Sequence, residues 1–408
     1  MNIIQENKQI NRSHHVEIPQ PRQESRLHYG DPHIDRLSKN ANLSCKFHIH
    51  YEFERVNVNF VFKANSSSAI GSGHFIRSLN LGLALQERNH EIFFAYNDLL
   101  AAHQNILFSK GISSLKMDLA LMKNSGNTEA DEIESFINNQ GLLNVDWIIV
   151  DDYGTDGIWD LQMRRISNKL MVIEDLHFSQ RNCDILLDMN YRSNDFMKSV
   201  NTIYPTSMTL VGPEYALLDS FYAKSRSNFQ FMDIDFPIIM LYFGSNDEFS
   251  LTLRSLKILL QAFPKLHIRV IILDNNVDKR EISTLANAHK NTVKLFIDPP
   301  SLGEIADGCE ISIGAGGISL WERFSLGIFC LCFATADNQC IPLEELAQAG
   351  SIDYLGYAEF YTETKIKESL DFYLANRSDL IKIRIRNKIL CDGNGVERVI
   401  RLIMEKSQ

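Results

Sequence analysis

The sequence lacks the features that mark several large classes of proteins. No apolar run comes near the roughly eighteen residues that a membrane-spanning helix needs, and the longest ones, 238–243 and 329–334, have the length of buried strands. Basic residues are too few for a nucleic-acid-binding surface, because 41 Lys and Arg stand against 51 Asp and Glu and leave a net charge of -10. We therefore expect neither membrane insertion nor a nucleic-acid partner, and any phosphate site has to be local.

Cysteine is also scarce and unpaired in pattern. There are seven cysteines, an odd number with no CxxC pair, which suits a reducing compartment and predicts a cytoplasmic protein. Cys330, Cys332 and Cys340 lie in or beside one apolar segment that has no nearby His and no fourth Cys. Packing in the core explains them better than a metal site. No cofactor and no metal are expected.

The length of 408 residues predicts two domains, because a single core usually splits below that size. Residues 1–54 form a polar leader that holds six of the twelve histidines. Their spacing matches no metal site, and we expect this leader to be disordered or loosely docked. We place one domain at 55–228 and another at 229–408, with the last helix crossing back to the first domain.

Each half of the chain alternates strand-like and helix-like segments. In the first half, helices are predicted at 75–85, 131–139 and 159–167, and strands at 56–63, 91–96, 147–150, 170–173 and 184–187. In the second half, a helix is predicted at 249–263, and strands at 236–243, 267–273, 293–297, 311–313 and 329–333. Such alternation predicts two doubly wound α/β domains with parallel sheets, and a ligand cleft at the carboxyl ends of their strands.

The first glycine motif, Gly71-Ser-Gly-His74, stands between a predicted strand and a predicted helix. Glycines allow a sharp turn, and histidine titrates near neutral pH, so the motif is a candidate site for a base. His74 is alternatively a helix cap or a buried partner of a carbonyl. A dinucleotide fingerprint would need a third glycine at Ile76, although Asp98 after the next strand keeps a weak form of that interpretation open.

The second motif, Gly314-Ala-Gly-Gly317, also follows a strand and precedes a helix. A glycine loop at a helix start presents free N–H groups and a partial positive charge, which bind phosphate without lysine. The loop lacks the GK[ST] ending of an NTPase. Glu322, about one turn into the helix, either accepts hydrogen bonds from ribose hydroxyls or is simply a favourable charge in a first turn.

Further motifs follow these two in a fixed order along the chain. They are Phe62-Lys-Ala-Asn-Ser-Ser-Ser-Ala-Ile-Gly-Ser-Gly-His-Phe-Ile-Arg77, Ile149-Val-Asp-Asp-Tyr-Gly154, Glu174-Asp-Leu176, Cys183-Asp-Ile-Leu-Leu-Asp-Met-Asn190, Gly212-Pro-Glu-Tyr-Ala-Leu-Leu218, Phe243-Gly-Ser-Asn-Asp247, Ile313-Gly-Ala-Gly-Gly-Ile-Ser-Leu-Trp-Glu322 and Asp337-Asn-Gln339. With them the chain resembles the hydrolase family of pseudaminic acid biosynthesis, which cleaves UDP-2,4-diacetamido-2,4,6-trideoxy-β-L-altropyranose. The resemblance covers 56–356, with an echo at 392–399.

The resemblance implies a GT-B-like fold of two Rossmann-type domains and a metal-independent hydrolysis of a UDP-sugar for flagellin or surface glycan. Water attacks the anomeric carbon with inversion, and UDP leaves. The implied catalytic residues are His74, Tyr153 and Asn338. The implied UDP-binding residues are Gly244, Gly314, Gly316, Gly317, Ser319 and Glu322, and the implied substrate-binding residues are Ser72, Gly73, Arg77, Asn65, Asn190 and Gln339. Arg77 contacts a phosphate or pairs with a carboxylate, and the second is favoured.

The chain departs from the family pattern close to this predicted site. Lys63 and Asn65 stand where the family commonly has Arg and Asp, Asp152 where it has His, and Ser245 where it has Gly. Asn65 removes a carboxylate that would tune His74. Two alternatives therefore stay open beside the hydrolase: a GT-B glycosyltransferase that uses a UDP-sugar donor, and a catalytically weakened homologue that binds the UDP-sugar. The expected partner is the small-molecule substrate, and a monomer is compatible with the sequence.

Overall fold

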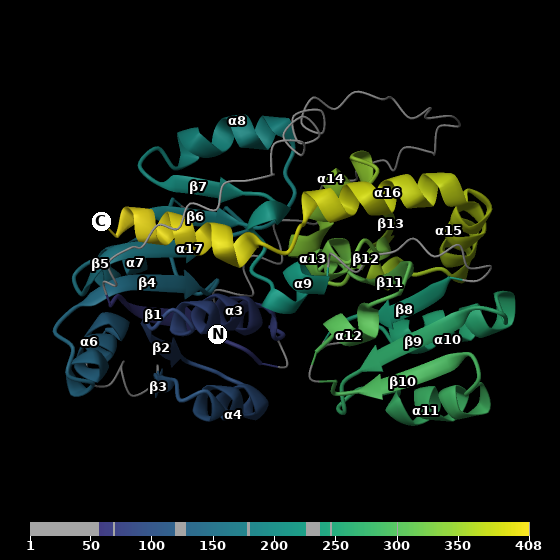
Figure 1. Cartoon of the computed structure of the whole chain (residues 1–408), viewed down its shortest axis with the longest axis horizontal. Helices are drawn as coiled ribbons and strands as arrows, with labels where there is room; N and C mark the ends of the chain where they lie inside the picture. Colours follow the sequence, from purple (N-terminus) through teal and green to yellow (C-terminus); the bar gives the residue numbers. More distant parts are fainter. Residues whose placement is uncertain are drawn as a thin grey trace, which may run out of the picture. The chain divides into compact units, whose positions relative to one another are not determined.

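The structure is a computed structural model that describes residues 57–67, 70–118, 128–177, 180–225, 237–244, 247–299 and 301–407. The predicted leader at 1–54, the boundary at 228, and Ser245 lie outside the described residues. All described residues belong to one compact unit, Glu54–Gln408. Within them the strands form two parallel sheets, ordered β3-β2-β1-β4-β5-β6-β7 and β10-β9-β8-β11-β12-β13 (Figure 1).

The first sheet is built from strands that alternate with helices. Its elements are β1 (Asn59–Ala64), α3 (Gly73–Gln86), β2 (Glu91–Tyr96), α4 (Ala101–Ser109), β3 (Ser113–Lys116), α6 (Glu129–Asn139), β4 (Val145–Asp151), α7 (Gly157–Met163), β5 (Ser167–Ile173), β6 (Ile185–Asp188), α8 (Asn194–Ile203), β7 (Met208–Val211), η2 (Pro213–Tyr215) and α9 (Ser220–Ser225). The second sheet repeats the scheme with β8 (Ile238–Tyr242), α10 (Leu251–Ala262), β9 (His267–Ile272), α11 (Lys279–Ala288), β10 (Val293–Ile297), α12 (Gly303–Ala306), β11 (Ile311–Ala315), α13 (Ser319–Ser325), β12 (Phe329–Ala334), η4 (Asp337–Gln339), α14 (Cys340–Gln348), β13 (Ile352–Tyr357), η5 (Ala358–Phe360), α15 (Glu363–Ala375) and α16 (Arg377–Leu390).

The continuous apolar strands reflect burial on both faces of each sheet. On β1, Phe60 and Phe62 pack into one core cluster, whereas Val61 packs into another on the opposite face. On β8, Leu241 and Met240 divide in the same way between two clusters. Parallel strands covered by helices on both faces lose the polar alternation of exposed sheets, which explains why these strands are recognisable as apolar runs.

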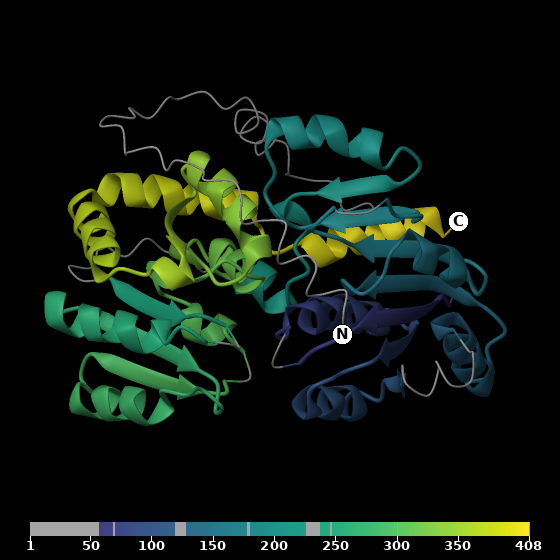
Figure 2. The ribbon, with the colours of Figure 1, turned by 180° about the vertical axis from the view of Figure 1, so that it is seen from behind.

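The last helix, α17 (Gly395–Lys406), packs against α3 and η2 of the first half. Val399 and Ile403 belong to the same core cluster as Phe60 and α3, and the Trp147 Nε1–H donates to Ser407 Oγ at 2.7 Å. Figures 1 and 2 show this helix among the elements of the first half in both views. Gly395 permits the close approach, because a Cβ there would lie 2.2 Å from the carbonyl oxygen of Ala216.

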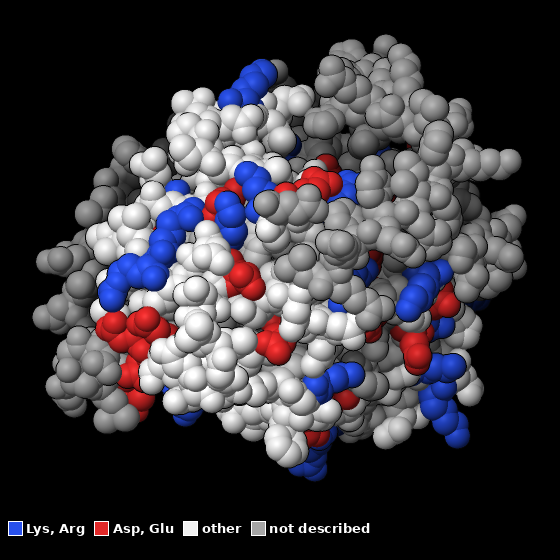
Figure 3. All heavy atoms as spheres, turned by 60° about the vertical axis from the view of Figure 1, so that its left-hand side comes forward, with Lys and Arg blue, Asp and Glu red and all other residues white. Residues whose placement is uncertain are grey.

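Most predicted segments agree with the structure, and one helix was extended too far. The predicted strands 91–96 and 293–297 coincide with β2 and β10. The helix predicted at 159–167 ends instead at Met163, because the chain turns there and Ser167 pairs with Val145 as the first residue of β5. In the described part of the chain, no helix combines the length and apolar character needed to cross a membrane. Basic and acidic side chains are interspersed on the face seen in Figure 3.

Candidate functional site

The first glycine motif lies where the strand order of the first sheet reverses, at the carboxyl ends of β1 and β4. Gly71 has a φ of 78°, a conformation that favours glycine. Its N–H donates to the Ser67 carbonyl at 2.9 Å, which closes a tight turn. Ser72 then occupies the cap position of α3, and His74 lies in the first helical turn. Doubly wound sheets bind ligands at such a reversal.

His74 is held by a carboxylate from the neighbouring strand. Its Nδ1 lies 2.6 Å from Oδ1 of Asp151, the last residue of β4, and both side chains are buried. Burial alone would raise the pKa of Asp151, but Arg77 and His74 lower it to about 2. An ionised carboxylate only accepts, so the contact requires a hydrogen on Nδ1, and in a neutral imidazole the lone pair is then on Nε2. Nε2 makes no hydrogen bond to any residue that the structure describes.

Asp151 was missed as a site residue from the sequence. The available signal was its place at the carboxyl end of an apolar strand, inside Ile149-Val-Asp-Asp-Tyr-Gly154. The expectation that Asn65 deprives His74 of its tuning carboxylate is accordingly revised, because Asp151 supplies that carboxylate.

Arg77 forms the carboxylate pair that the sequence favoured. Its Nε and Nη2 both donate to Asp151, the second at 2.5 Å to Oδ1, and Nη2 lies 3.1 Å from His74 Nδ1. Burial alone would lower the pKa of the guanidinium, but Asp151 raises it. Arg77 therefore stays charged and neutralises the buried carboxylate that orients His74.

Tyr153 and Asn338, the other two predicted catalytic residues, contact one another beside His74. The Asn338 Nδ2–H donates to the Tyr153 hydroxyl at 3.0 Å, and that hydroxyl donates to Asp175 at 2.7 Å. The rings of Tyr153 and His74 meet edge to face, with centroids 4.6 Å apart and an interplanar angle of 87°. Asn338 comes from η4 in the second half of the chain, so the three residues form one continuous set of contacts.

The three described departures from the family pattern meet in one cluster. Lys63 Nζ and Asn65 Nδ2 both donate to Asp152 Oδ2, at 2.6 and 2.7 Å. Lys63 is 1% exposed and also donates to Asn97 Oδ1 at 2.5 Å. The charges of Lys63 and Asp152 neutralise one another beside the His74–Asp151 pair.

The second glycine motif is shaped by close packing. A Cβ at Gly314 would lie 2.1 Å from the Tyr242 carbonyl oxygen, and one at Gly316 would lie 2.7 Å from Leu343 side-chain atoms, whereas one at Gly317 would meet nothing within 4 Å. Arg323 Nη2 donates to the Ala315 carbonyl at 2.5 Å and fixes the loop from below. Close packing therefore explains the glycines at 314 and 316 but not the one at 317.

Ser319 and Glu322 lie on the first turn of α13. Ser319 is buried, and Arg323 Nη2 lies 3.5 Å from its hydroxyl. Burial raises the pKa of Glu322 to about 7, although a hydrogen bond from the Tyr222 hydroxyl opposes the rise. The Glu322 carboxyl therefore changes charge near neutral pH.

The two glycine motifs lie next to each other. A Cβ at Gly73 would lie 3.8 Å from Cγ2 of Ile318, the residue that follows the second motif. Ile318 packs against core clusters of both sheets. His74 and the Gly314–Gly317 loop consequently belong to one candidate site.

The remaining predicted residues lie around this site with less defined contacts. Gly244 follows β8 with a φ of 89°. Asn190 follows β6, and its N–H donates to Asp188 at 2.9 Å. Gln339 Oε1 accepts from the Thr335 N–H at 3.0 Å, so its amide turns toward its own loop.

Comparison with known proteins gives one weak sequence relative. No family model matches the chain. The spore coat polysaccharide biosynthesis protein SpsG of Bacillus subtilis is 20% identical over 196 residues, which is 48% of this chain and 57% of SpsG. The match thus spans little more than half of that relative.

Solved structures decide the fold. MurG of Acinetobacter baumannii matches 86% of this chain and 100% of its own with a TM-score of 0.61 at 14% identity. A UDP-glucosyltransferase from Polygonum tinctorium matches 86% and 99% with a TM-score of 0.63 at 11% identity. The chain has a GT-B fold. The UDP-GlcNAc 2-epimerase of Neisseria meningitidis, bound to UDP-GlcNAc, matches 86% and 100% with a TM-score of 0.54 at 14% identity, and the expected fold class is confirmed.

Proposed function

We propose that the chain hydrolyses a UDP-linked diacetamido-trideoxy sugar to UDP and the free sugar, as a cytoplasmic enzyme of pseudaminic acid biosynthesis. One observation carries the proposal: His74 is oriented through Nδ1 by Asp151, while Nε2 makes no described hydrogen bond, at a turn that lies beside Ile318, the residue after the second glycine loop. An imidazole held in one tautomer by a carboxylate is suited to act as a general base.

The chemistry follows from these positions. His74 Nε2 accepts one proton of a water molecule, and the water oxygen forms a bond to the anomeric carbon as the bond from that carbon to the UDP oxygen breaks. The electron pair leaves with UDP, and the second proton of the water stays on the new hydroxyl. Attack opposite the departing diphosphate inverts the anomeric centre. Since UDP is a stable leaving anion, no strong general acid is required.

The nucleotide is assigned to the second half of the chain. Gly314, Gly316, Gly317 and Ser319 would face the diphosphate through backbone N–H groups, and the open space at Gly317 supports this. Glu322 would accept from the ribose hydroxyls. Structures with the same fold support a nucleotide of this kind, since TcCGT1 was solved in complex with UDP and the Neisseria enzyme with UDP-GlcNAc.

The sugar is assigned to the side of Tyr153 and Asn338, which lie beside His74. Support for its identity comes from the family resemblance of the ordered motifs, and SpsG, a protein of polysaccharide biosynthesis, is consistent with it. The cluster of Lys63, Asn65 and Asp152 borders this side and is the place where the acyl groups or ring configuration would be selected.

A glycosyltransferase is the second candidate, because MurG and the Polygonum enzyme share the fold. One experiment separates the candidates: the protein is incubated with a panel of UDP-sugars, UDP is assayed, and proton NMR reports the anomer first formed. Release of UDP without an acceptor and with inversion supports the hydrolase. Release only with an acceptor supports the transferase, and binding of UDP without turnover identifies a binding homologue.

A further inference from the structure

Asp175 is a mostly buried carboxylate that joins the residues around His74 and has no role in the assignments above. It lies just beyond β5, and its side chain is 15% exposed. Its two oxygens lie 2.7 and 3.0 Å from the Tyr153 hydroxyl, and Oδ2 lies 3.9 Å from Arg77 Nη1. Asp175 thus contacts both the Tyr153 hydroxyl and the Arg77 guanidinium.

The direction of the Tyr153 hydrogen bond is fixed by its partners. Burial raises the pKa of Tyr153 far above its ordinary value, and the charge of Asp175 adds to the rise, so the phenol keeps its hydrogen. The phenol donates that hydrogen to the Asp175 carboxylate and accepts from Asn338 Nδ2 at 3.0 Å. With one lone pair taken by Asn338, the phenol oxygen has one further lone pair for another donor.

Tyr153 needs such a partner, because the residue as a whole is only partly buried. The residue is 43% exposed and lies in the turn between β4 and α7. Its ring nevertheless meets the His74 ring edge to face at 4.6 Å. Without the Asp175 acceptor, the ring keeps only the Asn338 hydrogen bond and the His74 contact, so its orientation is less restricted.

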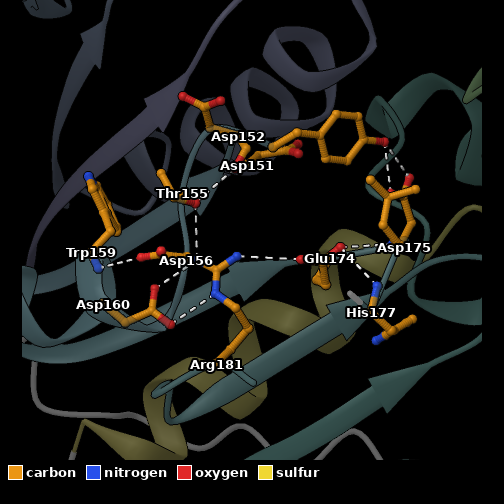
Figure 4. A network of polar contacts seen from close by, with 12 residues as sticks. Asp151, Asp152, Thr155, Asp156, Trp159, Asp160, Glu174, Asp175, His177 and Arg181 are labelled. Atoms are coloured by element: carbon orange, nitrogen blue, oxygen red, sulfur yellow. Dashed lines mark hydrogen bonds and ion pairs between the residues drawn. The ribbon is translucent and has the colours of Figure 1, made fainter. Parts of the chain in front are cut away.

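The turns that carry Tyr153 and Asp175 are braced by one buried arginine (Figure 4). Arg181 bonds both oxygens of Asp160, at 2.7 and 2.9 Å, and Nη2 donates to Thr155 Oγ1 at 3.1 Å, two residues beyond Tyr153. Its Nη1 lies 3.4 Å from Glu174, whose other oxygen accepts from the Leu176 N–H at 2.7 Å. Residues next to both ends of the Tyr153–Asp175 contact are therefore joined through Arg181.

We infer that Asp175 is a positioning residue: it takes the Tyr153 hydroxyl hydrogen, holds the ring beside His74, and leaves the phenol oxygen as an acceptor for an N–H or O–H group of the sugar. The kinetic part of this inference rests on the proposed function, whereas the positioning part does not.

The positioning part is tested by NMR on the unliganded protein. The imidazole protons of His74, assigned with His74→Gln, sense the ring current of Tyr153. We expect Asp175→Ala and Tyr153→Phe to move these signals to similar new positions. Asp175→Asn, which keeps an acceptor oxygen but removes the charge, leaves them nearly in place. Unmoved signals in a folded Asp175→Ala protein, or signals that move as far in Asp175→Asn as in Asp175→Ala, would overturn the inference.

The kinetic part is tested by a double-mutant cycle with UDP release as the readout. Asp175→Ala is expected to lower kcat about 10- to 100-fold with little change in KM, and Asp175→Asn to recover most of the loss. The double variant Asp175→Ala, Tyr153→Phe is expected to be no slower than Tyr153→Phe. A double variant whose loss in kcat equals the product of the two single losses would show that Asp175 acts independently of Tyr153. Asp195→Ala, whose side chain is 92% exposed, is the control. A wild-type protein that releases no UDP would contradict the proposed function, while the NMR result still decides the positioning role.

Discussion

Nδ1 of His74 and Oδ1 of Asp151 lie 2.6 Å apart, although 77 positions separate the two residues in the chain. One comes from the first turn of α3 and the other from the end of β4. Adjacent parallel strands place them together, because Ala64 of β1 pairs directly with Asp151. The fold thereby gives the histidine a fixed tautomer.

Replacing Asp151 by Asn is expected to damage both activity and stability. The amide no longer requires the hydrogen on Nδ1, so the share of imidazole with a basic Nε2 falls and kcat drops by about 100-fold or more. Loss of the charge leaves Arg77 buried without its main partner, which costs about 3–5 kcal/mol. UDP release and urea unfolding measure the two effects. Asp195→Asn, on an exposed helix, should change neither.

The stability that Asp151 contributes should change with pH in the acid range. Its pKa is lowered to about 2 in the folded protein, against about 3.9 when unfolded. A depressed folded pKa means that the contribution, about 2–3 kcal/mol, is fully present above about pH 5 and is lost progressively as the pH falls through the folded pKa near 2. Unfolding curves between pH 3 and 6 should therefore converge for wild type and Asp151→Asn as the pH falls. A gap that stays constant across this range would contradict the assignment.

Replacement by alanine should have different effects at two glycines of the second motif. Gly314→Ala places a Cβ 2.1 Å from the Tyr242 carbonyl oxygen, so we expect about 1–3 kcal/mol of destabilisation. Gly317→Ala meets no atom within 4 Å and should leave the melting temperature nearly unchanged while it weakens UDP binding. Calorimetric titration with UDP tests this pair. If Gly317→Ala binds UDP with the affinity of the wild type, the assignment of the diphosphate to this loop is contradicted.

Glu322 should make the affinity for UDP change with pH near neutrality. With its pKa raised to about 7 by burial, the carboxyl is mostly protonated at pH 6 and ionised at pH 8. An ionised carboxylate accepts the ribose hydroxyls more strongly, so affinity should rise with pH. Glu322→Gln should weaken binding about tenfold at pH 8 and reduce the pH dependence to that of the UDP phosphate itself. Glu344→Gln, at an exposed position of α14, is the control.

The strands and the two glycine motifs were predictable because they are local patterns. Continuous apolar runs such as Phe329–Ala334 identify strands buried on both faces, and glycines at strand ends identify turns. Elements with weak patterns were not found: β3 is largely exposed, and β13 mixes buried with half-buried positions. The His74–Asp151 pair and the Tyr153–Asp175 pair depend on strand order and on turns, which no spacing along the chain encodes.

The most direct test of the account compares single-turnover hydrolysis of the UDP-sugar by wild type, His74→Ala and His289→Ala. His289 is an exposed histidine at the end of α11 and controls for loss of an imidazole. The account predicts UDP release without acceptor by wild type and His289→Ala, and a rate at least about 100-fold lower in His74→Ala with UDP affinity unchanged within about twofold. Equal rates in wild type and His74→Ala would contradict water activation by His74.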